Sequence, residues 1–119
     1  MITETEYKKD LNLEGLSQFT GTEQYHRCLN ALLTDGVAYV MKNGYSWFIT
    51  DMLIVAKMKL RNEEFLSITL KLLENNKAEM IITNGNGKTL YTQKYEFTDA
   101  KKGINLYFVD NVLMLSSEY

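Results

Sequence analysis

The sequence predicts an α+β domain in which a helical segment packs on an antiparallel meander sheet of four to five strands. Two observations carry this prediction. Apolar residues between 47 and 60 recur with the spacing of a helix, whereas from residue 64 onward they recur at every second position, the period of a strand. The segment Asn84-Gly85-Asn86-Gly87 then separates two of these strands with residues that tolerate positive φ, as a hairpin turn requires.

The chain of 119 residues has the length of one domain, so we expect a single domain over residues 1–119. Residues 1–15 are polar and mixed in charge, and we expect an N-terminal arm or a short helix there. Residues 23–29 are predicted as a short strand, although periodicity alone does not separate a strand from a helix in so short a run.

A short helix is predicted over residues 37–42. Thr34 or Asp35 is expected to cap it, because a side-chain oxygen at that position accepts a backbone N–H group of the first turn. Asn43-Gly44 is expected to end it, since glycine is the common residue just beyond a helix.

The main helix is predicted over residues 47–60, with Ser46 as its N-cap and Trp47 against the sheet. Its wide apolar arc is typical of a helix that packs on a sheet. The strands that follow are predicted at residues 65–73, 78–83, 88–97, 104–109 and 112–115.

The composition narrows the classes of function. The net charge of −2 and the pI of about 5.4 argue against a strongly basic, non-specific nucleic-acid binder. One histidine and one cysteine are too few for a zinc site of four ligands, so we expect no metal and no cofactor. With no cysteine pair, no signal-peptide layout and no apolar run of membrane-spanning length, we expect a cytoplasmic protein without a membrane partner.

His26 and Cys28 form a His-x-Cys pair, which on a strand would lie on one face about 6–7 Å apart. Such a pair can act as base and nucleophile, so a Cys/His hydrolase is our third functional hypothesis. No side chain that would orient the histidine is evident in the sequence. We therefore interpret both residues as structural and expect no catalytic residues.

Tyrosines and one glutamine form the candidate partner-binding site. Tyr91, Gln93 and Tyr95 alternate along one predicted strand and so face the same way, and Tyr107 comes near them if the strands pair as a meander. Large aromatic side chains are enriched at interfaces and can stack on bases. We expect the tyrosine row on the sheet face opposite the helix; the alternative is that it packs in the core. Nearby lysines would add a modest basic patch: Lys88, Lys94, Lys101 and Lys102.

Four segments carry a resemblance to a known family. They are Phe19-Thr-Gly-Thr-Glu-Gln-Tyr, Leu33-Thr-Asp-Gly-Val-Ala-Tyr-Val, Trp47-Phe-Ile and the terminal Ser-Glu-Tyr. In this order they resemble a family of small uncharacterised proteins of bacteria and their mobile elements, classified as a domain of unknown function. The resemblance implies a compact α+β domain and brings no catalytic residue with it.

We expect a non-enzymatic interaction protein. The specific hypothesis, by analogy of context, is a phage- or mobile-element-encoded inhibitor that binds a host protein or ribonucleoprotein of bacterial defence, such as an RNA-guided effector, as anti-CRISPR proteins do. An acidic, tyrosine-bearing surface would occlude a basic channel of that partner. The alternative is a small RNA- or DNA-binding regulator that uses the tyrosines and lysines of one sheet face. The oligomeric state is left open.

Overall fold

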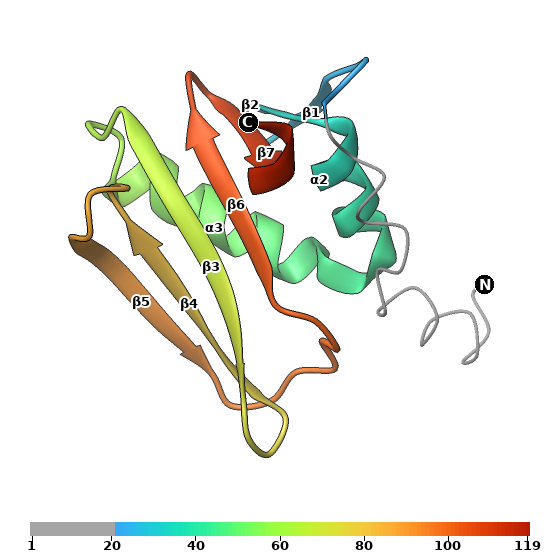
Figure 1. Ribbon diagram of the computed structural model, residues 1–119, viewed down its shortest axis with the longest axis vertical. Coiled ribbons are helices and arrows are strands. Elements are labelled where there is room, and N and C mark those ends of the chain that lie inside the picture. Colours follow the sequence, from blue (N-terminus) through green and yellow to red (C-terminus); the bar gives the residue numbers. More distant parts are fainter. Residues whose placement is uncertain (1–20) are drawn as a thin grey trace.

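A long helix, α3 (Ser46–Lys59), lies across one face of a mixed sheet (Figure 1). The computed structural model describes residues 21–119, so the arm expected at residues 1–15 lies outside the described residues. The strands are β1 (His26–Cys28), β2 (Ala31–Leu33), β3 (Phe65–Leu73), β4 (Lys77–Thr83), β5 (Thr89–Tyr95), β6 (Ile104–Val109) and β7 (Val112–Leu115). They form one seven-stranded sheet in the order β1-β2-β7-β6-β3-β4-β5.

The sheet is larger than predicted, and it is not purely antiparallel. Neighbouring strands pair antiparallel except β2 and β7, which are parallel. The α+β class and the five predicted strands from β3 to β7 are confirmed, whereas the expected four-to-five-stranded meander is wrong. β1 lies within the short strand predicted at residues 23–29, whereas β2 was not predicted. Each has three residues, and they turn at Leu29-Asn30, where both residues have positive φ. The three residues of β2 are too few for a period of two to be visible in the sequence.

Two helices follow each other closely and are separated by a kink at Asn43-Gly44 within the segment between them. The helical segments are α2 (Asp35–Val40), the π-helical turn η2 (Met41–Tyr45) and α3. Thr34 caps α2 as predicted, because its hydroxyl oxygen accepts the N–H of Val37 at 3.4 Å. Asn43 and Gly44 leave the helical conformation, with Gly44 at φ 98°, so the predicted end of the first helix is confirmed. Ser46 begins α3 and does not cap it, since Tyr45 holds the N-cap position and makes no side-chain capping bond.

The core lies between α3 and the sheet. Tyr45 is fully buried there, and its hydroxyl donates to the backbone carbonyl of Lys102 at 3.0 Å, which ties the loop before β6 to the start of α3. Trp47 is half-buried and packs edge-on against Tyr95 of β5, with ring centroids 4.9 Å apart, so its predicted contact with the sheet is confirmed. The buried side chains include Phe48, Ile49, Met52 and Leu53 of α3 and Leu66, Ile68, Leu70, Met80, Ile82, Leu106 and Leu113 of the sheet.

We expect Phe48→Ala to lower the free energy of unfolding by about 3–5 kcal/mol, because it removes a fully buried aromatic ring and leaves a cavity. Trp47 is the chain's one tryptophan, so its fluorescence during denaturant unfolding provides the measurement. Tyr25→Ala, which truncates an aromatic ring that is 58% exposed, is the matched control and should change little. Equal unfolding midpoints for Phe48→Ala and the unchanged protein would contradict the placement of Phe48.

Candidate functional site

Three of the four residues predicted to bind a partner face the helix, which corrects their expected orientation. Tyr91, Gln93 and Tyr95 lie opposite Ile82, Met80 and Ala78 of β4, and these three residues are buried in the core. Directly opposite residues share a sheet face, so the tyrosine row also lies on the helix side. Among the alternatives left open by the sequence, partial burial beneath the helix is correct.

Specific contacts hold the two tyrosines of this row. The Tyr95 hydroxyl donates to a carboxylate oxygen of Asp51 on α3 at 3.0 Å. Burial, and next this hydrogen bond, raise the pKa of Tyr95 above its ordinary value. The Tyr91 hydroxyl donates to the side-chain oxygen of Gln93 at 3.1 Å, and the ammonium of Lys59 lies 5.2 Å from the centre of the Tyr91 ring. The row therefore joins β5 to α3.

Tyr107 lies on the other face of the sheet, so it is not a neighbour of Tyr91 and Tyr95. It pairs with Ser67 of β3 and Met114 of β7. Its ring centre is 5.1 Å from that of Phe65 and 5.2 Å from that of Tyr119, and the latter two are 5.8 Å apart. We call these three rings the aromatic cluster, and the sheet face that carries it the open face. The sequence analysis missed Phe65 and Tyr119. Both lie outside the strand of Tyr107, so the two-residue period of that strand does not point to them.

The two ends of the open face differ in charge. Lys71 and Lys94 both lie opposite Glu79, at the end of β3 remote from the aromatic cluster. A shallow hollow of about 590 Å³ lies at the same end, and Lys101 and Lys102 line it together with Lys71. We call these four lysines the lysine end. Lys88 is not part of it, because it precedes the other end of β5.

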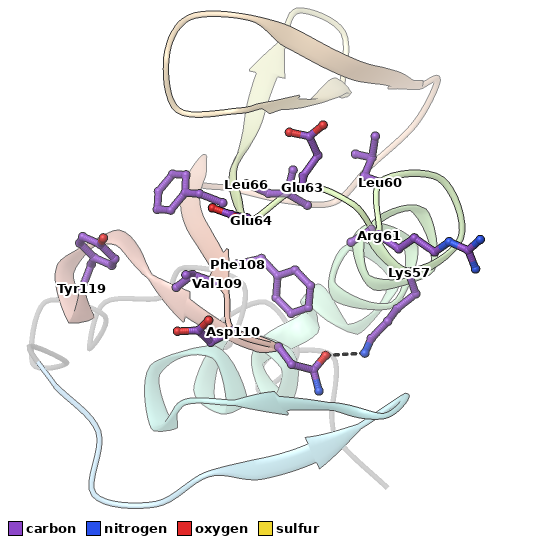
Figure 2. A pocket seen from close by; sticks show the side chains of 13 residues that line it. Lys57, Leu60, Arg61, Glu63, Glu64, Leu66, Phe108, Val109, Asp110 and Tyr119 are labelled. Carbon is purple, nitrogen blue, oxygen red and sulfur yellow. Dashed lines mark hydrogen bonds between the residues drawn. The ribbon is translucent and has the colours of Figure 1, made fainter.

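A groove of about 770 Å³ borders the aromatic cluster, between the end of α3 and the β6–β7 turn (Figure 2). Phe65 and Tyr119 of the cluster line it. The ammonium of Lys57 donates to the side-chain oxygen of Asn111 and, at 2.9 Å, to the backbone carbonyl of Asn30. It therefore fixes the β6–β7 turn and the β1–β2 turn to α3. The carboxylates that line this groove are Glu63, Glu64 and Asp110, with Arg61 as the other cation besides Lys57.

The start of α2 gathers residues from both ends of the described chain. One carboxylate oxygen of Glu118 accepts the Thr34 hydroxyl at 2.6 Å and the Leu115 N–H at 2.9 Å. The other oxygen accepts the Gly36 N–H at 3.1 Å. Glu118 lies in η3 (Ser116–Glu118), and its charge is favourable beside the N–H groups of a helix start. The segments Leu33-Thr-Asp-Gly and Ser-Glu-Tyr, separate in sequence, therefore meet in one capping cluster.

Asp35 extends this cluster toward β1. The Asp35 carboxylate accepts a hydrogen bond from the Glu23 N–H and is hydrogen-bonded to Nε2 of His26, each at 2.9 Å. The backbone N–H of Asp35 donates to the Thr22 hydroxyl at 2.9 Å. The Glu23 hydrogen bond, and next that of His26, hold the pKa of Asp35 below its ordinary value of 3.8.

His26 therefore has an orienting partner, contrary to the expectation from the sequence. Its hydrogen bond reaches Asp35, nine residues later, and not Cys28, which is half-buried and packs against the core. Among residues 21–119, no group of three or more histidine, cysteine, aspartate or glutamate side chains could hold a metal ion. The pair His26–Asp35 fixes β1 to the start of α2, and Cys28 takes no part in it.

We expect Gly36→Ala to destabilise the domain by about 1–3 kcal/mol, the usual cost of forcing an extra group into a packed site. A Cβ atom at Gly36 would lie 2.4 Å from a methyl carbon of Leu115 and 2.6 Å from a carboxylate oxygen of Glu118. Displacement of Glu118 would break its three hydrogen bonds, to Thr34, Gly36 and Leu115. Gly21→Ala is the control, because a Cβ at Gly21 meets no atom within 4 Å. Equal melting temperatures for the two variants would contradict this packing.

Asp35 should give the domain an acid-sensitive stability. Its folded pKa lies below its unfolded value, so the contribution is present above about pH 4 and is lost as the pH falls through the folded pKa. We expect melting temperatures of the unchanged protein to fall below that pH, and Asp35→Asn to show a smaller fall from a lower neutral-pH value. Asp99→Asn, an exposed aspartate, is the control. If the melting temperature of Asp35→Asn fell with pH as steeply as that of Asp99→Asn, Asp35 would not be the source of the acid-sensitive stability.

Comparison with known proteins identifies a family without an assigned role. No described helix is long and apolar enough to cross a membrane. None of the curated proteins and none of the solved structures matches the chain significantly. A family model covers residues 10–119, which include the capping cluster, the aromatic cluster and every described element. The chain belongs to the family of unknown function DUF6876.

Proposed function

We propose that the protein is a non-enzymatic interaction protein that docks on its partner with the open face of the sheet. The observation that carries this proposal is the aromatic cluster of Phe65, Tyr107 and Tyr119, which lies on the sheet face opposite α3. Tyr119 is 73% exposed. Large aromatic side chains are the commonest carriers of binding energy at protein interfaces.

The surroundings of the cluster favour binding of a protein. Ile81, Val112 and Met114 are half-exposed on the same face, so an apolar surface continues from the rings across β4 and β7. Phe65 and Tyr107 sit on paired strands, Tyr119 follows η3, and the three rings pack on one another, which limits the side-chain entropy lost on binding. Tyr107 is thus retained from the predicted site, with two rings that the sequence did not connect to it.

We propose further that the partner is a bacterial defence nucleoprotein, such as an RNA-guided effector, and that the chain acts as a mobile-element-encoded inhibitor. The resemblance to small proteins of bacteria and their mobile elements motivates this choice. The carboxylates Glu63, Glu64 and Asp110 border the aromatic cluster, and a negatively charged rim suits a basic nucleic-acid channel. Occupation of that channel would block guide or target strands by steric exclusion.

A second candidate function has its own observation. Lys71 and Lys94 of the lysine end lie on the same face as Tyr107, so a single strand of RNA or DNA could contact these lysines with its phosphates and the cluster with its bases. A gel shift with total RNA over a salt series separates the two candidates. Direct binding that weakens steeply with salt, and weakens further in Lys71→Ala/Lys94→Ala, would favour the regulator over the protein-binding inhibitor.

We expect Tyr107→Ala/Tyr119→Ala to weaken partner binding by more than about 2 kcal/mol, the usual threshold of a hot spot. The partner is first isolated on the immobilised unchanged protein from host lysate, and binding isotherms are then measured with purified components. Tyr25→Ala is the matched control, since it removes an exposed aromatic ring just before β1, which β2 and β7 separate from β6 and its Tyr107. A melting curve of each variant verifies folding. Undiminished affinity of the folded double variant would refute docking through the open face.

A further inference from the structure

The outer edge of β5 is free to accept another strand. Within residues 21–119, β5 pairs with β4 on one side and with no strand on the other (Figure 1). Such an edge offers a row of backbone N–H and C=O groups to a second chain. The opposite edge, β1, has three residues, and very short edge strands are one way in which proteins prevent such pairing. β5 has seven residues, so it is the edge suited to association.

The register of β5 limits how a second strand can pair with it. A bulge at Leu90 interrupts the pairing with β4, and the regular stretch is therefore Tyr91–Tyr95 with Gln93 at its centre. An identical antiparallel strand can pair with this whole stretch only around a two-fold axis through Gln93. In that register Lys94, the one charged residue of the stretch, faces Thr92 of the second copy, so like charges do not meet.

The helix side of this register is complementary in charge. Tyr91 would face Tyr95 of the second copy, a favourable aromatic cross-strand pair. Lys59 lies over Tyr91, whereas Asp51 accepts the Tyr95 hydroxyl. In this register, Lys59 of each copy would lie near Asp51 of the second copy. The two-fold symmetry would give two such pairs of opposite charge.

Exposed apolar side chains border the same edge. Met58, next to Lys59, is 76% exposed, and Phe97, two residues after Tyr95, is 69% exposed. They lie at opposite ends of β5, so an antiparallel copy brings Phe97 of one chain toward the Met58 end of the other. Exposed large apolar groups beside an unpaired strand are typical of an interaction surface.

We propose that the chain forms a two-fold dimer in which the two β5 strands pair antiparallel around Gln93. The axis is perpendicular to the sheet, so the open faces of both copies lie on one side of a continuous sheet. The dimer does not depend on the proposed function, but it would present two aromatic clusters to a partner at once and so raise the apparent affinity.

Sedimentation velocity of the full chain over a wide concentration range tests association. We expect a monomer–dimer equilibrium, and we expect Lys59→Asp, which places two carboxylates level with each other, to raise its Kd at least about tenfold. Lys42→Asp makes the same charge change on an exposed lysine of η2 and should leave Kd unchanged. A monomer at all concentrations, or an equal effect of the two variants, overturns the proposal.

Cysteine cross-linking tests the register. In a Cys28→Ser background, Gln93→Cys lies directly opposite itself in the dimer, within the distance that a disulfide requires. Thr92→Cys lies diagonally from its copy, at about 7–8 Å, and serves as the control. We expect mild oxidation to give a covalent dimer of the first variant and little of the second. The reverse result, or no covalent dimer of either, overturns pairing around Gln93.

Discussion

The carboxylate of Glu118 joins the two ends of the described chain, and the rest of the fold depends on this junction. It accepts hydrogen bonds from Thr34, Gly36 and Leu115, so β2, α2 and β7 meet at one point. The parallel pairing of β2 with β7 starts beside it. The junction adds side-chain bonds to the backbone pairing that already holds β2 against β7. A single buried methyl at Gly36 would disturb all three elements, because the space for a Cβ is already filled by Leu115 and Glu118.

The two faces of the sheet differ in burial because α3 covers one of them. On the covered face, Tyr91 and Tyr95 have their rings half-buried and their hydroxyls bonded to Gln93 and Asp51. Substituting them would therefore test stability as well as binding. On the open face, the rings of Phe65, Tyr107 and Tyr119 pack on one another, and Tyr119 is 73% exposed. This difference moves the proposed docking surface from β5 to β3, β6 and the end of η3.

His26 shows how the same residue can support two interpretations. A histidine bonded to an aspartate is a common catalytic arrangement, yet here the bond fixes β1 to the start of α2. Cys28 is not part of the hydrogen-bonded group and packs against the core. The interaction at this corner is electrostatic, because the ionised carboxylate of Asp35 accepts the Glu23 N–H and bonds to the His26 ring, and it is ionised only above its lowered pKa. The polar cluster therefore serves the fold, whereas the proposed docking surface consists of the aromatic rings.

The sequence by itself determined the α+β class, the five strands from β3 to β7, the main helix and the cap at Thr34. Each of these depends on contacts within a few residues or on a period that repeats over several turns or pleats. Tertiary structure alone decided the rest. β1 lies within a strand predicted at residues 23–29, but β2 is too short to show a period and is a strand because β7 lies beside it. The face taken by Tyr91 and Tyr95 followed from their register against β4, since a shift of one residue reverses every side chain. The aromatic cluster likewise required three segments of the chain to meet. Asp35 became a partner of His26 only because the chain folds β1 back onto α2, and sequence periodicity does not predict a contact of this kind.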